Sequence, residues 1–82
     1  MAPLAPHWPL IPKKPIPSID ALAAEDGQLL AHLWQVIRDL ARKLDLGGGY
    51  RVVANCGPDG GQTVDHLHFH ILGGRPMLWP PG

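Results

Sequence analysis

His66-Leu67-His68-Phe69-His70-Ile71-Leu72 is the stretch of this 82-residue chain that decides its fold and its chemistry. Histidine alternates there with apolar residues, which is the period-two pattern of a β-strand. In a strand over residues 64–72, the histidines share one face and the apolar residues share the other. The pattern therefore predicts an apolar face packed on the core and an opposite row of imidazoles about 6–7 Å apart.

Three functions fit such a row of imidazoles. The first is a merely polar surface, which requires three scarce residues to alternate by chance. The second is a metal site, because neutral imidazole is a common zinc ligand and His-x-His pairs on strands can chelate the ion. The third is nucleophilic and acid–base catalysis, because neutral imidazole is a good nucleophile near pH 7 and neighbouring rings can donate protons.

The loop just before the histidines favours catalysis on a phosphate. Gly57-Pro58-Asp59-Gly60-Gly61-Gln62-Thr63 combines bare backbone amides with an amide side chain and a hydroxyl. Glycines let a backbone approach a phosphate closely, and the N–H groups of a turn can form an anion-binding nest. The arrangement predicts a phosphate held against a histidine nucleophile.

The segments before this loop predict a helix and a partner strand. Apolar residues spaced three or four apart predict an amphipathic helix over residues 18–46, ended by Gly47-Gly48-Gly49. Its stripe consists of Leu29, Leu30, Leu33, Trp34, Ile37, Leu40, Ala41 and Leu44. His32 lies at the border of this stripe and is expected to be partly buried. Residues 50–56 predict a strand that pairs antiparallel with the histidine strand, with the helix covering one face of the sheet.

The first 17 residues are rich in proline. Pro9-Leu10-Ile11-Pro12-Lys13-Lys14 resembles a PxxP ligand for an SH3-like partner. The alternative is an extended segment that includes an edge strand, where proline is tolerated.

Charge and composition exclude several classes of protein. Seven basic residues balance seven acidic ones, so no overall field attracts nucleic acid or an anionic membrane. The single cysteine, Cys56, rules out an internal disulfide and a cysteine-based zinc finger. No apolar run reaches the roughly 20 residues that span a bilayer, and the first residues lack the features of a signal peptide. A soluble cytoplasmic protein is expected.

The histidine stretch matches the signature of the histidine triad family. Other motifs resemble its nucleotide-binding branch, and the closing Trp-Pro-Pro-Gly is the most specific of them. These motifs are Ile11-Pro12-Lys13-Lys14, Tyr50-Arg51-Val52-Val53-Ala54-Asn55, Asp59-Gly60-Gly61-Gln62-Thr63, Leu72-Gly73-Gly74-Arg75-Pro76-Met77 and Trp79-Pro80-Pro81-Gly82. The resemblance covers residues 7–82. It implies a single α+β domain in which an antiparallel sheet with three strands packs on one long helix. Its expected parts are residues 1–17 (extended segment and first strand), 18–46 (helix), 50–72 (catalytic hairpin) and 73–82 (tail).

The resemblance also implies an activity and a set of roles. Members of this branch hydrolyse the P–N bond of purine nucleoside 5′-phosphoramidates, including aminoacyl adenylates, without a metal or cofactor. By position, His68 is the nucleophile and forms a nucleotidyl-histidine, while His70 binds a phosphate oxygen or the leaving group. His66 supports the row and proton transfer, and His7 falls at the family's fourth site histidine.

Further residues would hold the nucleotide. Phosphate or 5′-oxygen contacts are implied, beside those of His68 and His70, for Asn55, Gly61, Gln62 and Thr63. Trp79 would reach the site of a neighbouring subunit, because the family forms homodimers.

The chain departs from the family pattern at its start. The family usually carries about 40 more residues before the position of His7, a helix and a hairpin that supply the base pocket and a ribose-binding carboxylate. Pro9 stands inside the first expected strand, and Pro15 replaces a frequent histidine. Two alternatives to the hydrolase therefore stay open: a catalytically weak or inactive module that binds nucleotide or protein, and a metal-dependent hydrolase with histidine ligands.

Overall fold

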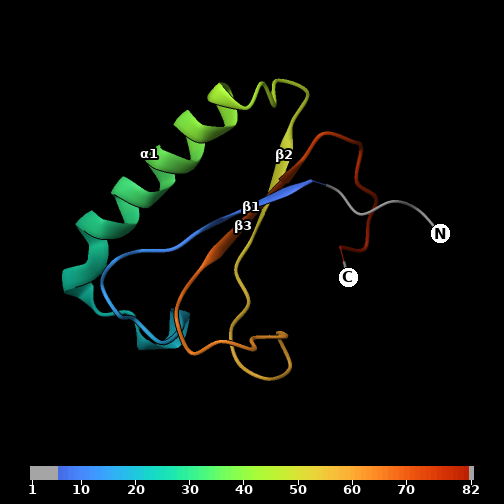
Figure 1. The fold of residues 1–82 in the computed structure, drawn as a ribbon. Helices are drawn as coiled ribbons and strands as arrows, with labels where there is room; N and C mark the ends of the chain where they lie inside the picture. Colours follow the sequence, from blue (N-terminus) through green and yellow to red (C-terminus); the bar gives the residue numbers. More distant parts are fainter. Residues whose placement is uncertain (1–5, 82) are drawn as a thin grey trace.

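Three strands and one long helix build the fold of the computed structural model, which describes residues 6–81 (Figure 1). The strands are β1 (His7–Leu10), β2 (Tyr50–Val53) and β3 (Phe69–Gly73), and the helix is α1 (Gly27–Lys43). The sheet has the order β1-β3-β2, and both pairings are antiparallel. The expected α+β architecture, a three-stranded antiparallel sheet with one long helix, is confirmed.

The central strand β3 separates the core from the opposite face of the sheet. Phe69 and Ile71 are buried, and Ile71 has no exposed surface. They pack in one cluster with Leu33 and Ile37 of α1, so the helix covers this face. His70 lies between them in sequence and therefore points to the other face, where it lines a pocket together with Met77 and Pro81 of the C-terminal tail.

The helix is shorter than the predicted range of residues 18–46. Two single turns of 3₁₀ helix, Ile19–Ala21 and Ala24–Asp26, come before α1. At the other end the helix stops at Lys43, before the three glycines. Asp45 takes a left-handed conformation with φ of 58°, and the N–H of Leu46 donates back to the Ala41 carbonyl at 2.9 Å. This is a Schellman ending with aspartate in glycine's usual place, and it buries Leu46 in the core.

Two residues of the helix are more exposed than expected. Trp34 belongs to the predicted apolar stripe, but half of its surface is exposed, and its ring lies tilted over Phe69 at 5.9 Å between centroids. His32 is exposed, so its predicted partial burial is wrong, because the buried stripe runs through Leu33, Ile37 and Ala41.

The histidine strand is also shorter than its pattern indicates. The pattern predicted a strand over residues 64–72, but β3 covers only Phe69–Gly73, so His66 and His68 lie before the strand. The chain leaves the sheet there because it bonds instead to the proline-rich connector, residues 11–18, which follows β1. The N–H of Leu67 donates to the Ile16 carbonyl at 2.6 Å. Leu67 is nevertheless buried while its neighbours are half-buried, so the alternation continues without strand pairing.

The other two strands lie at the sheet edges. β1 includes Pro9, which pairs opposite His70, and its edge position is where the missing N–H of proline is tolerated. β2 ends at Val53 rather than at residue 56. Within residues 6–81, no helix has the length and apolarity that a bilayer crossing requires.

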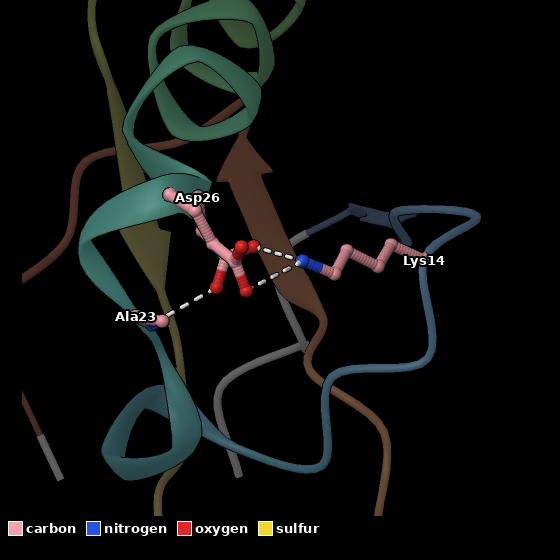
Figure 2. Close-up of polar contacts among 4 residues, drawn as sticks. Lys14, Ala23 and Asp26 are labelled. Carbon is pink, nitrogen blue, oxygen red and sulfur yellow. Dashed lines mark hydrogen bonds and ion pairs between the residues drawn. The ribbon is translucent and has the colours of Figure 1, made fainter.

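An ion pair joins the connector to the start of α1 (Figure 2). The Lys14 ammonium donates to the carboxylate of Asp26, which is almost fully buried. The same carboxylate accepts the backbone N–H of Ala23 at 2.9 Å. The bond from Lys14, and then that from Ala23, lower the pKa of Asp26 below its ordinary value. Replacing this carboxylate by a neutral amide would remove the charge-assisted bonds that it accepts from Lys14 and Ala23.

Asp26→Asn should therefore lower the Tm more than Asp39→Asn, which breaks the exposed Arg38–Asp39 pair. A carboxyl with a lowered pKa in the folded state stabilises fully above its ordinary value of 3.8 and loses this effect as the pH falls through the lowered pKa. The Tm difference between wild type and Asp26→Asn should thus be constant near neutrality and shrink well below pH 3.8. Equal Tm losses in the two variants at pH 7 would contradict this role of Asp26.

Candidate active site

Three of the predicted histidines gather on the face of the sheet opposite the helix. The ring centroids of His68 and His70 are 4.9 Å apart, and those of His7 and His70 are 5.6 Å apart. His7 comes from edge strand β1 and the other two from the stretch that enters β3. Residues separated by more than 60 positions in sequence thus form one cluster of imidazoles, with His70 in the middle.

Backbone carbonyls fix the orientation of two rings. His68 Nδ1 lies 2.8 Å from the His66 carbonyl, and His66 Nε2 lies 3.0 Å from the Pro12 carbonyl. A carbonyl oxygen only accepts, so each of these nitrogens carries the proton. The proton on Nδ1 leaves the lone pair of His68 on Nε2. The ring of His66, in contrast, donates to the Pro12 carbonyl of the connector. The backbone carbonyl of His66 accepts the Nδ1 proton of His68.

His70 differs from its neighbours electrostatically. Burial lowers the pKa of its imidazole below 6.5, and the positive charges that His68 and His7 can carry lower it further. The ring is therefore neutral at pH 7. A neutral imidazole still offers one N–H donor, so His70 can bind an oxygen without repelling a positive charge on His68.

The predicted phosphate loop is held together largely by its own contacts. Gln62 Oε1 accepts the N–H of Gly57 at 3.0 Å, and Gln62 Nε2 donates to the carbonyls of Pro17 and Val64 at 2.7 and 2.9 Å. The side chain therefore fastens the loop to the connector and is not directed at the histidines. Gly57 and Gly61 have φ of 72° and 80°, the left-handed region that favours glycine.

The remaining predicted site residues come from three other segments. Asn55 follows β2 and is half-buried, Thr63 is exposed in the loop, and Trp79 is 82% exposed in the tail. Within residues 6–81 none of these three side chains hydrogen-bonds to a histidine. The structure brings together His7, His68 and His70 and links His66 to His68 through its carbonyl.

The metal hypothesis finds no matching donor set in the described part of the chain. No three side chains of histidine, cysteine, aspartate or glutamate in residues 6–81 converge on a point where they could hold one ion. His66 turns its Nε2 to a carbonyl, which removes one member from the row that the sequence pattern predicted.

An open pocket of about 450 Å³ begins at His7 and His70. Its floor is apolar, and Arg51 of β2 and Arg75 of the tail line it as well. Sequence reasoning assigned no role to these arginines. Strand alternation packs Val52 against the core and therefore places Arg51 on the histidine face, and this is the sequence signal that could have located Arg51.

Comparison with known proteins agrees with this geometry. The HIT domain model matches residues 1–77. An uncharacterised HIT-like protein of Synechocystis is 53% identical over 76 residues, which cover 93% of this chain and 67% of that protein. A HIT-like protein of Synechococcus elongatus is 51% identical over 83 residues, covering 100% of this chain and 73% of the relative.

Solved structures give the same result. A HIT family hydrolase from Legionella pneumophila superposes with a TM-score of 0.93 at 46% identity, covering 98% of this chain and 73% of the other. A histidine triad protein from Clostridium difficile gives 0.86 at 38% identity, covering 95% and 70%. An antiparallel sheet with clustered histidines at its central strand defines the histidine triad class of protein. This chain belongs to that family, the HIT family.

The loop before the histidines yields a test of its packing. A Cβ at Gly60 would lie 2.4 Å from the Cys56 carbonyl oxygen, whereas a Cβ at Gly48 would meet nothing within 4 Å. Gly60→Ala should therefore lower the free energy of unfolding by about 1–3 kcal/mol in urea denaturation, as overpacking does. Gly48→Ala should change it by less than about 0.5 kcal/mol. A neutral effect of Gly60→Ala would show that the loop adapts freely.

Proposed function

We propose that this protein is a nucleotide-binding hydrolase that cleaves the P–N bond of purine nucleoside 5′-phosphoramidates. The observation that carries the proposal is the tautomer of His68. Its Nδ1 proton is bound by the His66 carbonyl, so Nε2 presents a lone pair next to His70. The hydrolase name of the similar Legionella pneumophila structure supports the reaction class.

The proposed reaction proceeds through a covalent intermediate. His68 Nε2 attacks phosphorus, the new N–P bond forms, and the P–N bond to the amine breaks. The departing amine takes one proton, which the His7 and His70 rings can relay from water. Water then attacks the nucleotidyl-histidine, and a P–O bond replaces the N–P bond to His68. The products are a nucleoside monophosphate, a free amine and the neutral histidine.

The surrounding groups fit the two states of this reaction. The His66 carbonyl stabilises the positive charge that His68 carries once phosphorus is attached, because the Nδ1–H bond strengthens as the ring becomes cationic. Neutral His70 can donate its N–H to a phosphoryl oxygen. In the glycine-rich loop the N–H groups of Gly57, Gly61 and Gln62 are already bonded within the loop, so further donors for an anion come from its remaining N–H groups.

Adenosine 5′-phosphoramidate should release AMP when incubated with the protein, and His68→Ala should lower kcat/KM by about 10³-fold or more. AMP release can be measured by ion-exchange chromatography. His32→Ala is the matched control, because His32 is an exposed histidine of α1, and it should retain wild-type turnover.

Other outcomes would point to the alternative functions. AMP binding without turnover in the wild-type chain would replace the hydrolase by a binding module. Turnover abolished by a chelator and restored by zinc would replace the histidine nucleophile by a metal centre. Equal turnover in His68→Ala and wild type would overturn the assignment of His68.

We also propose that the active form is a homodimer. Leu78 and Trp79 are 83% and 82% exposed in the tail, and large apolar side chains in a contiguous exposed segment are typical of interaction surfaces. Light scattering coupled to size-exclusion chromatography should give twice the 8.9 kDa chain mass. A monomer mass at micromolar concentration would contradict the proposal, and Trp79→Ala should shift the equilibrium towards the monomer.

A further inference from the structure

The peptide group between His66 and Leu67 carries a hydrogen bond on each of its two sides. Its carbonyl accepts the Nδ1 proton of His68 at 2.8 Å, and its N–H donates to the Ile16 carbonyl at 2.6 Å. A trans peptide group is planar, so its N–H and its C=O point in opposite directions. The position of the Ile16 carbonyl therefore fixes where the His66 carbonyl points. The direction of that carbonyl in turn selects the nitrogen of His68 that holds the proton.

The two bonds of this peptide group also strengthen each other. Donation from the Leu67 N–H to the Ile16 carbonyl polarises the group and leaves more negative charge on the His66 oxygen. That oxygen becomes a better acceptor for the His68 Nδ1–H, above all when the ring is cationic. Leu67 is only 1% exposed, so water does not take the place of Ile16 at this N–H.

The Ile16 carbonyl is held in turn by the ion pair of Lys14 and Asp26. The N–H of Ile16 donates to the Lys14 carbonyl at 2.9 Å, which closes a three-residue turn around Pro15. The Lys14 ammonium bonds to the buried carboxylate of Asp26 at the start of α1 (Figure 2). An unbroken series of contacts thus runs from the helix to the ring of His68.

The connector supports the candidate site at two further points. His66 Nε2 donates to the Pro12 carbonyl at 3.0 Å, and Gln62 Nε2 donates to the Pro17 carbonyl at 2.7 Å. Proline has a fixed φ, so these carbonyls belong to a backbone that is already restricted before the site forms. The connector therefore holds both the histidine stretch and the glycine-rich loop.

We infer that Lys14 and Asp26 are positioning residues for the proposed nucleophile, and that they select the Nδ1–H tautomer of His68 through the connector. This inference rests on the proposed hydrolase function and deepens it. Within residues 6–81 neither side chain hydrogen-bonds to a histidine; each bonds to the other. Their loss should therefore slow the attack on phosphorus and leave the binding of substrate nearly unchanged.

The kinetic test compares Lys14→Met with Lys13→Met. Lys13 is an exposed neighbour that makes no ion pair in the described part of the chain. Lys14→Met should lower kcat for adenosine 5′-phosphoramidate by about ten-fold with KM within about two-fold, because a displaced nucleophile loses rate rather than affinity. Lys14→Arg keeps a cation for Asp26 and should restore kcat to within about three-fold of wild type. Lys13→Met should retain wild-type kcat.

A spectroscopic readout distinguishes this role from a purely structural one. NMR of nitrogen-labelled protein at about pH 8, where free histidine is neutral, separates the Nδ1–H and Nε2–H forms of the His68 ring. Wild type and Lys13→Met should show the Nδ1–H form, and Lys14→Met should show a several-fold larger Nε2–H fraction. Pro15→Gly, at an exposed position, loosens the same turn without touching the ion pair. It should shift the tautomer in the same direction, and it decides the question if Lys14→Met is unfolded.

The tautomer measurement does not require turnover, so the two proposals fail separately. If wild type does not hydrolyse the phosphoramidate but the tautomer shifts in the variants, the hydrolase proposal fails and the positioning role stands. An unchanged tautomer in the folded variants would overturn the positioning role, even if kcat falls. Unchanged kcat in Lys14→Met, with an active wild type, would overturn it as well.

Discussion

The register of β3 is the constraint on which the rest of the structure depends. Side chains of a strand alternate, so a slip by one residue would exchange Phe69 and Ile71 for histidines against the helix. Burying imidazoles there without partners would cost free energy, and the apolar side chains would occupy the catalytic face. The packing of Ile71, which is fully enclosed, thus fixes the direction of His70. The register of β3 therefore determines both the packing of the core and the position of the candidate site.

The proline-rich connector between β1 and α1 extends this control beyond the strand. Its backbone accepts bonds from His66 and Leu67, and Ile16 adds a buried side chain to the core. Lys14 fastens the same segment to the start of α1 through Asp26 (Figure 2). The proposed nucleophile, His68, is therefore flanked by residues that a proline-rich segment distant in sequence holds in place.

Alternation and helical spacing identified the sheet face, the helix stripe and the pair of His68 and His70, because both patterns are local repeats. His7 was assigned to the site only through the family resemblance. The sequence did not indicate that β3 begins only at Phe69. That boundary depends on the hydrogen bond from the Leu67 N–H to the carbonyl of Ile16, a residue far away in sequence. It also assigned Gln62 to a phosphate, whereas the folded chain places Pro17 within reach of its amide. The buried ion pair of Asp26 and the left-handed conformation of Asp45 were not predicted, because an aspartate in the sequence does not by itself indicate either feature. Periodic features were predictable, and contacts between distant segments were not.

Arg51 connects two parts of the molecule that lie far apart in sequence. Its guanidinium reaches from β2 to the Leu78 carbonyl, one residue before the exposed Trp79. Thermodynamic linkage is reciprocal. A ligand that draws this guanidinium into the pocket weakens its hold on the tail, and anything that immobilises the tail alters how strongly the pocket attracts anions. Met77 and Pro81 of the tail line this pocket, so the position of the tail and the charge of Arg51 beside it are energetically coupled.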